Sequence, residues 1–193
     1  MKQLKRSGAL RNTIVLYLSD NGYFFGEHRI SRGKSWPYEP ALRVPYAIRV
    51  PAAYRKRKQR PVVKQVVSNT DVAPTILDYA GGVPSCATAT DCRILDGRSM
   101  RPLLAGGGSW PASRGVLAEI DSSLTSYAAI RTKRYMYAEY AGGQRELYNL
   151  VKDRFERRNV ADDPDYAHTQ ASLAHRLGVL RHCSGTAAPN ACE

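Results

Sequence analysis

The chain has 193 residues, which is enough to bury a hydrophobic core in one domain, or in a large domain with a small appendage. Its hydrophobic content of 43% and charged content of 24% are ordinary for a globular protein, and no apolar run approaches the ~20 residues of a membrane-spanning helix. The net charge of +12 favours an anionic partner, such as nucleic acid, an acidic membrane surface or a sulfated or phosphorylated substrate, although a solvated basic surface gives the same charge.

The amino-terminal residues, MKQLKRSGALRN, are basic and lack the apolar stretch of a signal peptide. Residues 2–8 are predicted to form the end of a helix, with Leu4 as its apolar contact and Gly8 as its C-cap. Residues 13–18 are an unbroken apolar run rich in β-forming residues. This pattern is typical of a central strand covered on both faces.

A polar cluster, Ser19-Asp20-Asn21-Gly22, follows this strand. Aspartate and asparagine accept local hydrogen bonds and glycine tolerates positive φ, so a plain turn explains these four residues by themselves. The carboxylate of Asp20 and the amide oxygen of Asn21 are also the kind of ligands that bind calcium or magnesium. Polar sites in α/β folds lie beyond the carboxyl ends of strands, where these two residues stand.

The next loop adds an acid and several cations: Glu27, His28, Arg29, Arg32 and Lys34. Oxygen ligands followed by cations within about 15 residues suit a metal bound to an oxyanion, with Lys34 as a point charge on the anion. His28 is equally well explained as a surface or turn histidine. A turn at Glu39-Pro40 and a strand at 44–50 are predicted next.

Five basic residues fall within 55–60 and are bracketed by prolines. We interpret this run as a solvated loop, with attraction of a polyanion as the alternative. A short strand is predicted at 61–67, and then a helix capped by Thr70 or Asp71 and ended by Gly81-Gly82. Capping explains Asp71 better than a metal site does. The apolar face of this helix is predicted to consist of Val72, Ile76, Leu77 and Ala80.

The four cysteines form two close pairs, Cys86 with Cys92 and Cys183 with Cys192. Proximity favours these pairings among the three that four cysteines permit, and the lack of a histidine or cysteine at zinc-site spacing favours disulfides over a metal. Disulfides indicate a secreted, periplasmic or extracellular protein.

The glycine-rich residues 106–109 are predicted to connect two domains, 1–105 and 110–193. The second domain is expected to hold an antiparallel sheet and one final helix that packs back on it and starts at Asp162-Asp163-Pro164. These two carboxylates therefore indicate a helix start rather than a metal site. The tyrosines of the strands are interpreted as half-buried core residues rather than as a platform for stacking bases. The strands are predicted at 116–120, 128–132, 135–140 and 146–150. The apolar positions of the helix, which keep approximate helical spacing, are Ala167, Leu173, Leu177 and Leu180.

The order and spacing of several segments resemble the sulfatase family, within the wider alkaline-phosphatase-like superfamily. The likeness covers the carboxyl-terminal third of such enzymes and is closest in style to N-acetylglucosamine-6-sulfatase-like and arylsulfatase-like members. The segments that carry it are SDNG, GEH, GKSWPYE, LRVPYAIRVP, VSNTDVAPTILDYAG, LDGRSMRPLLAG, AAIRTKRYMYAEY and ELYNLVKD.

The resemblance implies an α/β fold: the carboxyl-terminal part of a mixed sheet flanked by helices, plus a small antiparallel sheet with one carboxyl-terminal helix. It implies that Asp20 and Asn21 are two calcium ligands, that Lys34 contacts the sulfate and that His28 lines the same pocket. The expected cofactor is Ca²⁺, and the expected substrate is a sulfated small molecule or a sulfated glycan.

The sequence departs from the family pattern at the nucleophile. Sulfatases carry near their amino-terminus two further aspartates and a Cys-x-Pro-Ser-Arg or Cys-x-Ala-x-Arg motif, whose cysteine is oxidised to formylglycine. Cys86 is followed by Ala-Thr-Ala-Thr and Cys183 by Ser-Gly-Thr-Ala, so neither fits. We therefore expect a carboxyl-terminal fragment that is inactive without the missing amino-terminal segment. The alternatives are a basic polyanion-binding module without catalysis, for which nucleic acid is a disfavoured ligand, and a phosphate or phosphonate ester hydrolase of the same superfamily.

Overall fold

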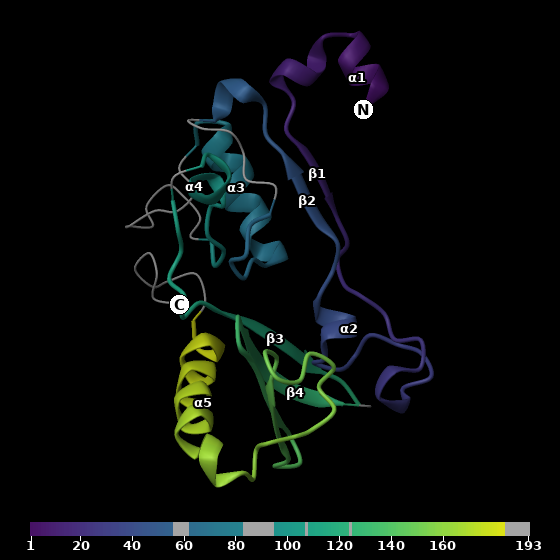
Figure 1. The fold of residues 1–193 in the computed structure, drawn as a ribbon, viewed down its shortest axis with the longest axis vertical. Helices are drawn as coiled ribbons and strands as arrows, with labels where there is room; N and C mark the ends of the chain where they lie inside the picture. The colour runs from purple at the N-terminus through teal and green to yellow at the C-terminus, as the bar shows by residue number, and fades with distance from the viewer. Residues whose placement is uncertain (56–61, 83–94, 107, 124, 184–193) are drawn as a thin grey trace. The chain divides into compact units, whose positions relative to one another are not determined.

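The computed structural model describes residues 1–55, 62–82, 95–106, 108–123 and 125–183 (Figure 1). The chain divides into two compact units, Met1–Asp20 with Pro45–Pro111, and Asn21–Val44 with Ala112–Glu193. The segment 21–44 thus groups with the carboxyl-terminal residues, and the division into domains 1–105 and 110–193 stays a prediction. In the part of the chain that is described, no helix is long and apolar enough to cross a membrane.

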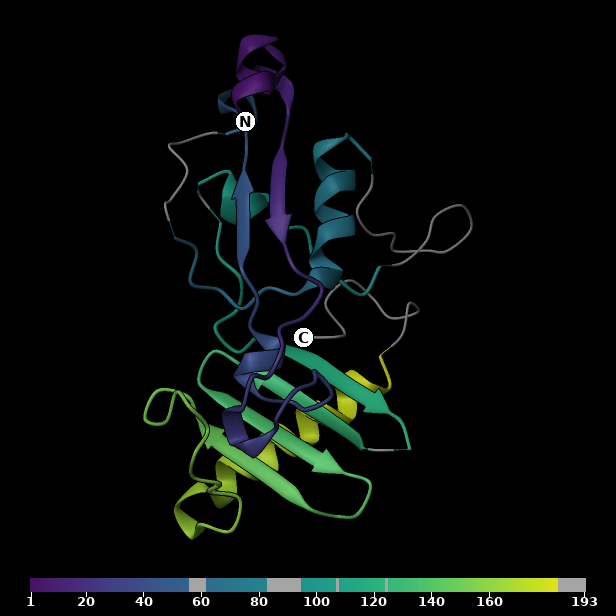
Figure 2. The same ribbon diagram turned by 90° about the vertical axis from the view of Figure 1, so that its right-hand side faces the viewer.

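The first unit begins with helix α1 (Lys2–Arg6), which ends as predicted near Gly8, at φ 75°, before a 3-10 turn at Ala9–Asn12. Strands β1 (Val15–Leu18) and β2 (Tyr46–Arg49) then pair antiparallel, with Val15 opposite Arg49 (Figure 2). The predicted strand at 44–50 is confirmed in shorter form.

The prediction of a central strand at 13–18 is wrong for the described residues. There β1 has β2 as its one neighbour, and Tyr17 is 69% exposed. An apolar run indicates that a strand favours burial, but it does not specify which elements cover it. The apolar run therefore predicted the strand correctly, but not which of its side chains are exposed.

The rest of the first unit consists of short helices around a small core. They are a 3-10 turn at Ala52–Tyr54, another at Asn69–Asp71, helix α3 (Val72–Tyr79) and helix α4 (Arg101–Leu104). Residues 62–67 do not form the strand predicted at 61–67. The buried core residues of this unit are Val50, Met100, Leu103, Leu104 and Trp110.

The start of α3 shows how the predicted cap is built. Asp71 holds the N-cap position of α3, as predicted, but makes no side-chain cap bond to it. Ser68 caps the preceding 3-10 turn at Asn69–Asp71: its hydroxyl accepts from Thr70 N, and Asp71 accepts from Ser68 N in return. This reciprocal arrangement is a capping box, and Asp71 also accepts from Arg98 N. Asp71 is therefore a buried carboxylate with structural hydrogen bonds.

The predicted apolar face of α3 is wrong in part, because Ile76 and Leu77 are 51% and 41% exposed while Pro74 and Thr75 are buried. Thr75 is buried because its hydroxyl donates to Asp71 O and accepts from Met100 N, which satisfies a polar group in the interior. The helix ends at Tyr79 with Ala80 as its C-cap, and Gly81 follows at φ 81°, in agreement with the predicted stop at Gly81-Gly82.

The second unit contains a four-stranded antiparallel sheet in the order β3-β4-β5-β6 (Figure 2). The strands are β3 (Gly115–Asp121), β4 (Ser126–Thr132), β5 (Tyr135–Tyr140) and β6 (Arg145–Asn149). All four agree with the predicted strands. A 3-10 turn at Pro164–Tyr166, capped by Asp163, leads into helix α5 (Ala167–Arg181), which confirms the predicted helix start.

The two faces of this sheet carry separate cores, because successive strand residues point to opposite sides. Helix α5 covers one face (Figure 1), with Ile130, Tyr137, Leu147 and Leu177 fully buried. The segment 21–44 packs on the other face against a second set of residues. The buried members of that second core are Phe24, Tyr38, Ala41, Tyr127, Ala129, Met136, Ala138 and Tyr148.

Segment 21–44 contains a 3-10 turn at Glu27–Arg29 and helix α2 (Glu39–Leu42). The turn predicted at Glu39-Pro40 is therefore wrong. Proline fits the first turn of a helix, where its missing N–H is not needed, so the Glu-Pro pair begins a helix here. Cys86, Cys92, Cys192 and most of the basic run lie outside the described residues, so neither predicted disulfide pair is described in full.

Candidate functional site

Lys34 and Asn21 meet although 12 residues separate them in the sequence. Lys34 Nζ donates a hydrogen bond of 3.1 Å to Asn21 Oδ1. The amide of Asn21 is oriented by a second bond, from its Nδ2 to Gly22 O at 2.6 Å. The loop between them folds back through the bridge of Phe24 with Gly33, which is why the two side chains come together. A predicted oxygen ligand, Asn21, and a predicted anion contact, Lys34, thus lie side by side.

Gly22 fixes the position of Asn21 on the second unit. Its N–H donates to Ala41 O, in helix α2, at 2.8 Å. A Cβ at Gly22 would lie 1.9 Å from Pro40 O, so no other residue fits this close backbone contact. The glycine that the sequence assigned to a turn therefore serves a close approach between two backbone segments.

His28 lies in the 3-10 turn at Glu27–Arg29 and has φ 53°, a conformation that is uncommon for a residue with a side chain. Its ring stacks on Tyr38 with a centroid distance of 4.0 Å and an angle of 5° between the planes. Phe24 contacts both rings edge-on. His28 is thus held by aromatic packing and is not a freely moving surface side chain.

Burial lowers the pKa of His28, and the nearby carboxylates of Glu146, Asp153 and Glu27 oppose that change. Glu27 itself accepts from Phe25 N at 2.6 Å, and this bond to its carboxylate lowers the pKa of Glu27. His28 is therefore held mainly as the neutral imidazole at pH 7, a form that can donate at one ring nitrogen and accept at the other.

Asp20 is exposed, and it ends the first of the two segments that make up the first unit. Its backbone oxygen and that of Ser19 accept from Asn69 Nδ2 at 2.9 and 3.1 Å. Asn69 belongs to the 3-10 turn before α3, so the end of strand β1 is tied to a helix start. No pattern in the sequence indicated this role for Asn69.

The residues present fit calcium as part of a ligand set. Asp20 offers a carboxylate and Asn21 an amide oxygen, which are hard oxygen ligands, but the ion takes six to eight oxygens. Among the described residues, no group of three or more histidine, cysteine, aspartate or glutamate residues could hold a metal. The chemistry of the ligands is thus suitable, and their number is too small for a complete site.

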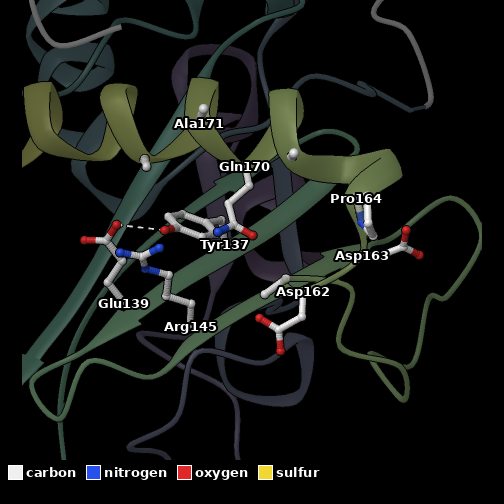
Figure 3. Close-up of a pocket in the computed structure, with 11 residues that line it drawn as sticks. Tyr137, Glu139, Arg145, Asp162, Asp163, Pro164, Gln170 and Ala171 are labelled. Carbon is white, nitrogen blue, oxygen red and sulfur yellow. Dashed lines mark hydrogen bonds between the residues drawn. The ribbon is translucent and has the colours of Figure 1, made fainter.

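Asp162 and Asp163 are among the residues that line a pocket of about 310 Å³ between α5 and strands β5 and β6 (Figure 3). Figure 3 also shows Tyr137 donating to Glu139, a bond of 2.8 Å. Asp163 caps the turn that starts α5 and pairs with Arg158 at 3.7 Å. The structure thus gives Asp163 a role at the helix start, as predicted.

Two supporting residues were missed by sequence reasoning. Tyr38 carries the ring on which His28 stacks, and Glu156 accepts from Glu39 N across 117 positions of sequence. A contact of this sequence separation has no local pattern, since it arises only when segment 21–44 packs on the sheet.

Comparison with known proteins gives a consistent result. A family described as "N-sulphoglucosamine sulphohydrolase, C-terminal" matches residues 26–183. An arylsulfatase of Chlamydomonas reinhardtii is 30% identical over an aligned length of 213 residues, and the alignment covers 98% of this chain and 33% of that protein. An N-acetylglucosamine-6-sulfatase of Bos taurus is 28% identical over 220 residues, which cover 96% of this chain and 37% of that protein. The chain spans about a third of the length of these relatives.

Solved structures agree with the sequence relatives. A protein in complex with its substrate, D-glucosamine-2-N,6-O-disulfate, matches with a TM-score of 0.74 and 28% identity over 92% of this chain and 35% of that one. A phosphonate monoester hydrolase of Agrobacterium radiobacter matches with a TM-score of 0.74 and 29% identity over 93% of this chain and 37% of that one. These structures confirm the expected sulfatase-like α/β fold. The match of residues 26–183 to the carboxyl-terminal family described above shows that the chain belongs to the sulfatase family.

Proposed function

We propose that this chain contributes the carboxyl-terminal part of a calcium-dependent sulfuric ester hydrolase that acts on a sulfated sugar. Asp20 and Asn21 are two of the calcium ligands, Lys34 contacts the sulfate and His28 lines the same pocket. The observation that carries the proposal is the bond of 3.1 Å between Lys34 Nζ and Asn21 Oδ1, because it joins the proposed anion contact to a proposed metal ligand.

The proposed roles follow from charge and geometry. A calcium ion, when bound, supplies positive charge to the sulfate oxygens. The ammonium of Lys34 adds a second positive charge on the same anion and is oriented by Asn21 Oδ1. His28, held neutral by burial and stacked on Tyr38, can donate a hydrogen bond to a sulfate or leaving-group oxygen.

The chain by itself is proposed to lack turnover. Two oxygen ligands are too few for tight calcium binding, and no cysteine of the 193 residues stands in a formylglycine motif. The cysteine pairs support a secreted, periplasmic or extracellular location. The N-acetylglucosamine-6-sulfatase relative supports a sulfated sugar or glycan as substrate. The glucosamine disulfate bound by one relative makes a sulfated glucosamine the first substrate to test.

The test measures sulfate release from glucosamine 6-sulfate by the protein as its gene encodes it, with calcium and after chelation. Lys34→Ala should lower kcat/KM by about 100-fold or more, the usual effect of removing a group that stabilises transition-state charge. Lys133→Ala, which removes an exposed lysine from the β4–β5 turn, is the matched control. Turnover that is unchanged in Lys34→Ala and in Asp20→Ala would contradict the proposal. Release of sulfate by residues 1–193 alone, lost in Asp20→Ala, would refute the proposed lack of turnover.

A second candidate is a phosphonate or phosphate ester hydrolase with the same residues, which the likeness to the phosphonate monoester hydrolase favours. Parallel assays with an aryl sulfate and an aryl phosphonate separate the two, because the preferred ester is the one with the larger kcat/KM. A polyanion-binding module that uses residues 55–60 predicts instead salt-dependent binding to heparin that survives Lys34→Ala.

A further inference from the structure

Glu156 is a buried acid that the proposed function does not use. It lies in the turn after β6, is 2% exposed and has φ 52°. The turn is built by Asp153, whose carboxylate accepts from Arg157 N and Arg158 N and whose backbone oxygen accepts from Glu156 N. Both the buried carboxyl group and the left-handed backbone are unfavourable, so the surrounding structure must hold them in place.

The carboxyl group of Glu156 caps helix α2. Its Oε2 accepts from Glu39 N at 2.8 Å, and Glu39 is the first residue of that helix. The first N–H groups of a helix have no partner within the helix, so this bond satisfies a group that would otherwise be unpaired. Tyr38, the N-cap residue, makes no side-chain cap bond of its own. Glu156 thus performs the capping from a distant part of the sequence.

Other charged groups surround this contact. Arg131 Nε donates to Glu39 Oε1 at 2.9 Å, and Arg43 lies 3.8 Å from Glu39 Oε2. The second oxygen of Glu156, Oε1, is buried with no hydrogen-bond partner within the described ranges. Burial raises the pKa of Glu156 to about 8; the carboxylates of Glu39 and Asp153 act in the same direction, against Glu39 N–H and Arg131. The group is therefore mostly neutral at pH 7.

Helix α2 supports two residues of the candidate site. Tyr38, directly before it, carries the ring that stacks on His28, and the Tyr38 hydroxyl donates to Glu146 Oε1 at 3.0 Å. Within the helix, Ala41 O accepts from Gly22 N, the residue next to Asn21. A displacement of the start of α2 would therefore move both His28 and Asn21.

We propose that Glu156 is a positioning residue for the sulfatase site, and that its carboxyl group anchors the start of α2 so that His28 and Asn21 keep their places. The inference rests on the proposed function for its effect on catalysis. It rests on the structure alone for its effect on His28. Glutamine at 156 keeps an oxygen that accepts from Glu39 N and removes the acid, whereas alanine removes the anchor.

The experiment compares Glu156→Ala and Glu156→Gln with wild type and with Glu119→Ala, an exposed acid on β3. The first measurement is the NMR shift of the His28 ring protons, which the stacked Tyr38 ring shifts upfield. The second is sulfate release by the protein as its gene encodes it. Glu156→Ala should lose the upfield shift and lower kcat by on the order of 10- to 100-fold with little change in KM, since small displacements of a reacting group have effects of this size. Glu156→Gln and Glu119→Ala should match wild type near neutral pH.

The outcomes separate the two proposals. A wild type that releases no sulfate contradicts the proposed function, while the His28 shift still tests the anchor. A His28 shift that is unchanged in folded Glu156→Ala overturns the anchor, whatever the activity. Where Glu156→Ala does not fold, Glu156→Met takes its place, because methionine keeps the volume of the side chain and removes the acceptor for Glu39 N; an unchanged His28 shift in Glu156→Met overturns the anchor.

Discussion

The ionisation of Glu156 predicts how the stability of the protein changes with pH. In the unfolded chain this carboxyl group has its ordinary pKa of 4.5, and in the folded protein burial raises the pKa to about 8. Between these values the folded state holds a proton that the unfolded state has lost. Stability therefore falls as pH rises from about 4.5 to about 8 and then stays level.

The size of the effect follows from the same shift. At about 1.4 kcal/mol per pKa unit, the ionisation of Glu156 lowers the free energy of unfolding by about 5 kcal/mol at most. The side chain is 2% exposed, so solvent screening does not reduce this value much. Relaxation of the turn at 153–158 would reduce it, because water can then reach the charge.

The Glu156→Gln variant removes this titration and keeps the acceptor for Glu39 N. Urea unfolding of both proteins, followed by tyrosine fluorescence at several pH values between 4.5 and 8.5, measures the difference in free energy of unfolding. The free energy of unfolding of the variant, relative to that of wild type, should increase steadily across this pH range. His28, whose pKa burial lowers, makes stability rise with pH below its ordinary 6.5, but it does so in both proteins and cancels in the comparison. Free-energy curves that run parallel within about 0.5 kcal/mol would refute the reasoning.

Two further substitutions test the second unit. Leu177→Ala removes a fully buried side chain from the core under α5 and should lower the free energy of unfolding by about 3 kcal/mol in urea, whereas exposed Val179→Ala should change it by less than about 0.5 kcal/mol. Gly22→Ala places a Cβ 1.9 Å from Pro40 O and should abolish most sulfate release by displacing Asn21. Its matched control is Gly178→Ala in α5, where a Cβ meets nothing within 4 Å; equal activity of the two variants would contradict the role of Gly22.

The carboxyl-terminal half of the fold could be predicted from the sequence because its determinants are local. The alternation of residues in β4 and β5 and the Asp163-Pro164 pair each act over a few residues. The four strands predicted for this half and its final helix are all present. Errors occurred where tertiary packing decides. The apolar run at 13–18 did not reveal that Tyr17 is exposed, and Glu39-Pro40 reads equally well as a turn or a helix start.

The candidate site was predicted in part for the same reason. Asn21, His28 and Lys34 lie in one short segment, so their types and order led to the hypothesis of an anion site, which stays a prediction. The bond between Lys34 and Asn21 adds a specific contact that spacing does not give. Tyr38 and Glu156 could not be found in this way, because their roles depend on how segment 21–44 packs on a sheet that begins more than 70 residues later in the chain.

The two faces of that sheet have different consequences for function. Tyr137 and Ile130 pack under α5, so changes there should act on stability first. Met136 and Ala138, one position along the same strand from their α5-facing neighbours, pack instead under the segment that carries His28 and Asn21. Because successive residues of a strand alternate between faces, neighbouring substitutions in β5 should separate into those that unfold the protein and those that displace the site. The sheet of the second unit is therefore both the core of that unit and the support on which the candidate site is held.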